Sequence, residues 1–125
     1  MATIDDFLKL EIKVGTILSV LEVGGSEKLL KLEVDFGYID QSPENNPLEV
    51  DTTDKVKDVR QVLSGIKKFV SIEDIVGKQF PFVTNLDPRM MMGMESQAMI
   101  LGAGSGDVFA LFNPTNKVPN GTKVK

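Results

Sequence analysis

Residues 30–36 alternate strictly between apolar and charged side chains. The apolar members are Leu30, Leu32, Val34 and Phe36, and the charged members are Lys31, Glu33 and Asp35. Because successive side chains of a β-strand point to opposite faces, this pattern predicts a strand with one face in a core and the other in solvent. The fold should therefore contain a sheet that is covered on one side.

Weaker period-two patterns and turn residues predict the remaining elements. We expect further strands at residues 11–23, 60–66, 79–85, 96–101 and 108–112. Thr3 followed by Asp6 predicts a helix over residues 4–10, and Ser71 followed by Asp74 predicts a second over 71–76. The glycine-rich stretch 102–106 precedes a strand pattern, which favours a hairpin turn over a phosphate-binding loop.

About five strands, with a short helix between the third and the fourth, is the order typical of an OB-fold. That fold is all-β, a five-stranded Greek-key barrel whose strand face and loops bind oligonucleotides. Composition alone leaves other small barrels open. The length of 125 residues fits a single domain over residues 1–125.

Composition bears on which functions are open to the chain. It contains neither Cys nor His, so it lacks the commonest nucleophile, general base and soft-metal ligands. We therefore expect a protein that is not an enzyme and has no cofactor or metal site. No apolar run approaches the roughly 20 residues needed to cross a bilayer, and no secretory signal is visible, so we expect no membrane association and a cytoplasmic setting.

The net charge of −4 is concentrated in one segment. Residues 40–58 hold six acidic residues against two lysines, while the rest of the chain is balanced. Residues 38–58 also contain prolines and asparagines and have little apolar surface to bury. They are therefore predicted to form an acidic loop inserted between two strands. Overall acidity argues against a nucleic-acid partner, but a local acidic loop leaves room for a basic face elsewhere.

Two segments carry a family resemblance. They read VLSGI at residues 62–66 and NLDPRMMMGMESQAM at residues 85–99. Together they resemble the core of the small tRNA-binding domain that occurs at the C-terminus of some methionyl-tRNA synthetases and as free-standing homodimers. The resemblance implies an OB-fold homodimer, joined through its N-terminal segment and C-terminal strands, that binds structured tRNA. It also implies a possible aminoacyl-tRNA synthetase partner.

The resemblance also implies which residues contact RNA. The matching positions are Lys68, Asn85, Arg89, Ser96 and Met99, with Lys28 and Lys67 as weaker candidates. Cations hold phosphates, while Ser and Asn offer hydrogen bonds to sugars and unpaired bases. Asp87 and Met90 stand where the family commonly has Lys, so we expect RNA binding to be weak and sensitive to salt.

Several alternatives stay open at this stage. Arg89 could clamp a phosphate or could pair with Asp87 or Glu95, and Lys67 and Lys68 could be a solvated pair at a strand end. We expect the methionines of residues 90–94 to pack in the core or at a dimer interface rather than to bind a soft metal. The alternative function is that of the related CsaA chaperones, a protein-interaction dimer with little RNA affinity.

Overall fold

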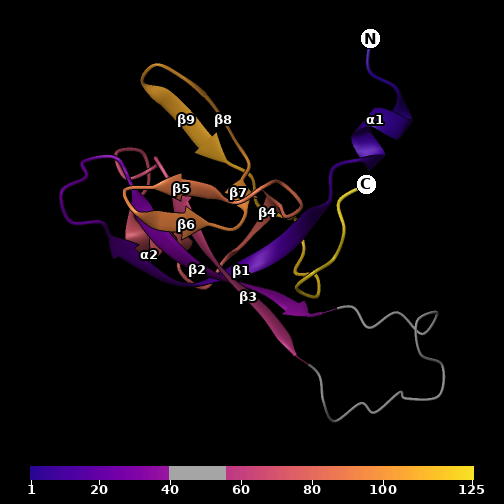
Figure 1. Cartoon of the computed structure of the whole chain (residues 1–125), viewed down its shortest axis with the longest axis horizontal. Helices are drawn as coiled ribbons and strands as arrows, with labels where there is room; N and C mark the ends of the chain where they lie inside the picture. The colour runs from indigo at the N-terminus through magenta and orange to yellow at the C-terminus, as the bar shows by residue number, and fades with distance from the viewer. Residues whose placement is uncertain (40–55) are drawn as a thin grey trace.

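The computed structural model describes residues 1–39 and 56–125. The helices of this part are α1 (Ile4–Leu8) and α2 (Ile72–Ile75). Its strands are β1 (Ile12–Glu22), β2 (Leu30–Tyr38), β3 (Lys57–Ser64), β4 (Gln79–Val83), β5 (Arg89–Met91), β6 (Met94–Ser96), β7 (Met99–Ile100), β8 (Gly102–Ser105) and β9 (Val108–Leu111) (Figure 1). None of the described helices is long and apolar enough to cross a membrane.

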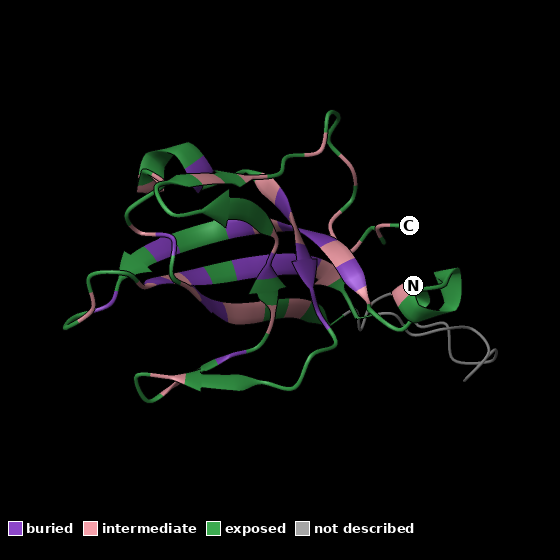
Figure 2. Ribbon diagram, turned by 90° about the horizontal axis from the view of Figure 1, so that it is seen from above, coloured by how far each residue is buried: buried purple, intermediate pink, exposed green. Residues whose placement is uncertain are grey.

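The main sheet has five antiparallel strands in the order β3-β2-β1-β4-β7. The alternation predicted for residues 30–36 is confirmed for the four apolar residues, which are buried, and for Glu33, which is exposed. It is wrong at Asp35, which is buried and pairs with Lys57. Val20, Leu32 and Val62 face one another across three strands, and all are buried. Figure 2 shows these buried positions on the strands of the curled sheet. The predicted all-β, five-stranded barrel of OB type is confirmed.

The aromatic core lies inside this curled sheet. Phe36 on β2 and Phe82 on β4 are almost completely buried, and their rings meet edge to face with centroids 5.2 Å apart. This arrangement is favourable because the positive edge of one ring meets the negative face of the other. The residues that line this core come from β1 to β4, β7 and α2.

The α1 helix begins at the predicted residue, and α2 begins one residue later than predicted. At α1 the Asp6 N–H donates to Thr3 Oγ1 at 3.3 Å, and the Thr3 N–H donates to Asp6 Oδ2 at 2.9 Å, a reciprocal capping box. At α2, Ser71 is the N-cap residue, but its hydroxyl makes no capping hydrogen bond. Both helices end earlier than predicted.

The segment after β4 departs most from the sequence prediction. Residues 89–91, where no strand was expected, form β5 and pair with β6. The single strand expected at 96–101 is instead two short strands, β6 and β7, on different sheets. The glycine-rich run expected to be a turn supplies strand β8, which pairs with β9. The β8–β9 hairpin projects from the body in Figure 1.

The predicted 38–58 loop is shorter at both ends than expected. Tyr38 still belongs to β2, and Lys57 and Asp58 already belong to β3. Tyr38 and Lys57 are paired across the two strands. The rest of the predicted loop, residues 40–55, lies outside the described residues.

Candidate nucleic-acid interface

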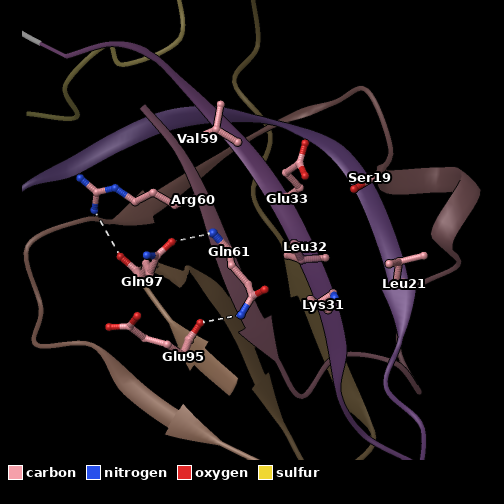
Figure 3. Close-up of a pocket in the computed structure, with 10 residues that line it drawn as sticks. All are labelled: Ser19, Leu21, Lys31, Leu32, Glu33, Val59, Arg60, Gln61, Glu95 and Gln97. Carbon is pink, nitrogen blue, oxygen red and sulfur yellow. Dashed lines mark hydrogen bonds between the residues drawn. The ribbon is translucent and has the colours of Figure 1, made fainter. Parts of the chain in front are cut away.

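The open side of the barrel is closed by a main-chain hydrogen bond and side-chain hydrogen bonds rather than by a continuous strand ladder. The Gln97 N–H donates to the Gln61 carbonyl at 2.8 Å, and the Gln61 N–H donates to Gln97 Oε1 at 2.9 Å. Gln61 Nε2 also donates to the Glu95 carbonyl at 2.9 Å (Figure 3). We call this contact between β3 and residues 95–97 the seam. It joins the edge of the sheet to the loop region that OB-folds use for binding.

Ser96, a predicted RNA contact, lies inside the seam. The Leu63 N–H donates to Ser96 Oγ at 3.0 Å, and Ser96 Oγ in turn lies 3.0 Å from the Ala98 carbonyl, to which it donates. Only 6% of the residue is exposed. Its hydroxyl is therefore used within the protein, and this geometry gives Ser96 a structural role.

Arg60 is a key residue of this region that the sequence analysis missed. Its guanidinium contacts both carboxylate oxygens of Asp58, at 2.9 and 3.1 Å. It also donates to the Thr84 carbonyl at 2.6 Å and to the Gln97 carbonyl at 3.2 Å. Arg60 thus ties β3 to the ends of β4 and β6. The sequence pattern could have revealed this role. Arg60 lies two residues before the buried Val62, and alternate residues of a strand point to the same face.

An open groove of about 450 Å³ lies between β1, β2, β3 and the seam, as Figure 3 shows. It is lined by Ser19, Leu21, Lys31, Leu32, Glu33, Val59, Arg60, Gln61, Glu95 and Gln97. We call it the sheet groove. Its charges balance, because two cations face two carboxylates. Since Arg60 is already paired with Asp58, this groove offers little attraction for a phosphate backbone.

Arg89 lies on the exposed surface of the β5–β6 hairpin. Over residues 1–39 and 56–125 it makes no ion pair, so neither of the predicted pairs with Asp87 or Glu95 forms. Met99, predicted to contact RNA, is also exposed on β7. These two side chains are available to a ligand.

The methionines around Arg89 do not all pack as expected. Met90 and Met92 are 64% and 57% exposed, so they do not pack in the core, and their packing at a dimer interface stays a prediction. A two-residue turn forces this arrangement, because Met92 and Gly93 both have positive φ, 48° and 77°. The Met92 side chain then approaches the β1–β2 turn. If Gly25 in that turn carried a Cβ atom, the atom would lie 3.6 Å from Met92 Cε.

Asn85, another predicted RNA contact, holds the N-terminal segment. Its Oδ1 accepts from the Glu11 N–H at 2.7 Å, and its Nδ2 donates to the Lys9 carbonyl at 2.8 Å. Both polar atoms therefore have protein partners. Beside it, the Lys13 ammonium lies 2.7 Å from Glu11, and this hydrogen bond lowers the pKa of the Glu11 carboxyl.

The three predicted lysines lie on two loops that touch each other. The Lys67 N–H donates to the Lys28 carbonyl at 3.1 Å, which joins the β3–α2 link to the β1–β2 turn. Lys67 Nζ lies 3.7 Å from Glu22 Oε2, so Lys67 forms an ion pair and is not only solvated. Lys28 and Lys68 are exposed. The structure thus brings Lys28, Lys67 and Lys68 together at the end of the sheet where β2 begins.

Comparisons of the sequence with known proteins identify its family. The family described as "Putative tRNA binding domain" matches residues 38–123. The methionine–tRNA ligase of Campylobacter jejuni is 42% identical over 97% of this chain, and methionine–tRNA ligase 1 of Bacillus anthracis is 42% identical over 98%. The chain spans only 16% of the length of each of these relatives.

Solved structures share the whole fold. A methionyl-tRNA synthetase related protein from Pyrococcus horikoshii superposes with a TM-score of 0.80 at 31% identity, covering 100% of this chain and 98% of its own. The chaperone CsaA from Bacillus anthracis superposes with a TM-score of 0.76 at 28% identity, covering 100% and 99%.

Proposed function

This chain belongs to the tRNA-binding domain family, and we propose that it is itself a non-catalytic module that binds tRNA. The observation that carries the proposal is the match of the family over residues 38–123. The exposed and unpaired Arg89 supports it, because a guanidinium without a carboxylate partner in the described structure is free to hold a phosphate. We propose that residues 1–125 act as one such domain in the cytoplasm.

The proposed contact surface is narrower than the set taken from the sequence. Arg89, Met99, Lys28 and Lys68 are exposed and are its members, with Lys67 at its margin because of its contact with Glu22. The side-chain polar atoms of Ser96 and Asn85 already have protein partners. We therefore propose that these two residues shape the surface and that RNA contact by them is secondary.

We also propose that two copies act together. The α1 helix has five residues and buries none of them, while Ile4 and Leu8 are 68% and 53% exposed. A helix this short is marginal in water unless its apolar side chains are covered, and a second copy would cover them. Two weak RNA surfaces in one dimer would raise the avidity without new contacts.

Association with a synthetase is the proposed setting of this module. Its relatives include methionine–tRNA ligases of which it spans 16%. We propose that it delivers tRNA to such an enzyme, either within the same chain or as a bound subunit. The alternative is a chaperone function, which the name of the CsaA structure indicates for that protein. It becomes the favoured hypothesis if the chain does not bind tRNA.

Fluorescence anisotropy with labelled tRNA tests the proposal. We expect binding that weakens steeply between about 50 and 200 mM salt. Arg89→Ala should weaken binding and reduce the slope of log affinity against log salt by about 0.7–0.9, the loss of one phosphate contact. Lys31→Ala in the charge-balanced sheet groove is the matched control and should change little. Absence of wild-type binding at low salt would refute the tRNA function.

A further inference from the structure

A second groove lies beside α2, away from the lining of the sheet groove. It has a volume of about 570 Å³ and runs between the β3–α2 link, α2 and the residues that follow β9. Its polar and aromatic lining includes Lys67, Lys68, Phe69, Ser71, Lys78 and Asn113. We call it the lysine groove. The α2 helix that borders it can be located in Figure 1.

The lysine groove is positively charged, unlike the sheet groove. Three lysines line it and one carboxylate, that of Asp74, opposes them. Lys68 and Lys78 are exposed and form none of the ion pairs found in the described part of the chain. Two ammonium groups that form no ion pair, against the single carboxylate of Asp74, attract an anion, and a phosphate is the anion that an RNA-binding protein meets.

An aromatic ring is held at the same site. Phe69 packs against Phe109, with ring centroids 5.1 Å apart and ring planes at 33°. That contact fixes the ring while 42% of the residue stays exposed. A fixed and partly exposed ring beside cations is the combination on which unpaired bases stack.

Two further groups in the lysine groove can form hydrogen bonds. The Ser71 hydroxyl makes no capping bond to α2. Asn113 donates through Nδ2 to the Gln79 carbonyl at 3.0 Å, and within the described residues its Oδ1 accepts no hydrogen bond. A hydroxyl and an amide oxygen suit the sugar and base edges of a nucleotide.

We propose that the lysine groove binds an unpaired nucleotide of the RNA, with its phosphate between Lys68 and Lys78 and its base against Phe69. The proposal deepens the tRNA-binding function and rests on it. An acidic peptide would also meet the lysines, but it would not use the exposed ring. The combined charge and aromatic surface therefore favours a nucleotide.

The direct test is an NMR titration of ¹⁵N-labelled protein with a single-stranded oligoribonucleotide of about five nucleotides, within the length that one OB-fold covers. We expect the largest shift changes at the amides of Lys68, Phe69, Ser71, Lys78 and Asn113. A matched titration with an acidic peptide should leave them nearly unchanged. Changes confined to the sheet groove, or larger changes with the peptide, would overturn the proposal.

Variants then assign the roles within the groove. Phe69→Leu keeps an apolar side chain against Phe109 but removes the aromatic face, so oligonucleotide affinity should fall roughly five- to a hundredfold. The double variant Lys68→Gln with Lys78→Gln should weaken binding and lower the salt slope. Lys31→Gln is the control in the sheet groove, and an equal loss there would contradict the assignment.

The outcomes separate the two proposals. Wild-type tRNA binding that persists unchanged in the Phe69 and lysine variants would refute the lysine groove but leave the module's function intact. Wild-type protein that binds no tRNA would refute the function. The oligonucleotide titration would then still decide the groove, because it reads the groove amides directly.

Discussion

Ser96 shows how one side chain can be assigned to either of two roles. The resemblance of residues 85–99 to the tRNA-binding domain implies that Ser96 contacts RNA. In the structure its hydroxyl accepts from the Leu63 N–H and is buried within the seam. The two roles predict different effects of removing the hydroxyl, on stability in one case and on affinity in the other.

Ser96→Ala should lower the free energy of unfolding by about 1–3 kcal/mol, because the Leu63 N–H would be left without its acceptor in the interior. Urea denaturation of the variant measures this loss. Ser105→Ala, at an exposed position of β8, is the matched control and should change stability little. An unchanged stability together with a weakened affinity for tRNA would instead make Ser96 an RNA contact.

Among the elements, the strands with a period-two pattern were predictable and the β5–β6 hairpin was not. The alternation over residues 30–36 defines β2 because one face of that strand is buried. Arg89, Met90 and Met91 show no such alternation, since the hairpin they form is a separate two-stranded sheet and two of them are exposed. Pro88 just before them also reads as a turn rather than a strand.

The seam was equally hidden from the sequence. Gln61 and Gln97 lie 36 residues apart and are joined through a side-chain amide, an interaction that imposes no periodicity on either segment. The same is true of the lysine groove, which collects residues from the β3–α2 link, the α2–β4 link and the chain after β9. The sequence could nominate Lys67 and Lys68 but not their neighbours Lys78 and Asn113.

The turn of the β5–β6 hairpin gives a prediction about this element. Met92 has φ of 48°, a left-handed conformation that costs an ordinary side chain roughly 1–2 kcal/mol, whereas Asn tolerates it and Asn-Gly is preferred in such turns. Met92→Asn should therefore raise the thermal midpoint, as measured by calorimetry. Met90→Asn, at an exposed strand position, is the control. A lowered midpoint for Met92→Asn would show that the side chain of Met92 stabilises the fold through its approach to the β1–β2 turn.

For the whole molecule, the proposed dimer depends on a helix that is nearly detached from its own domain. In Figure 1 the α1 helix stands apart from the sheet, and Asn85 anchors the chain that leads from it. Within the described protomer none of its residues is buried, and of its apolar side chains only that of Phe7 is partly covered. Their burial between two copies would give the helix the tertiary support that its length does not provide.

Sedimentation velocity should therefore give a species of twice the chain mass of 13.7 kDa. The double variant Ile4→Ser with Leu8→Ser should shift it toward the monomer, because the apolar surface that drives association is removed. Leu21→Ser, an equally exposed leucine in the sheet groove, is the control and should leave the mass unchanged. A wild-type monomer at all concentrations would rule out the dimer.

The two ends of the chain lie on the same side of the molecule. Lys13 of β1 and Lys123 form an isolated antiparallel β-bridge, so the C-terminal residues lie alongside β1. In Figures 1 and 2 both chain ends lie on the side of the molecule opposite α2. The lysine groove, which α2 borders, therefore lies on the opposite side of the molecule from both of these ends. A surface tether or a fusion partner added after Lys125 would present that groove outward, and an immobilised form of this domain should remain open to RNA in solution.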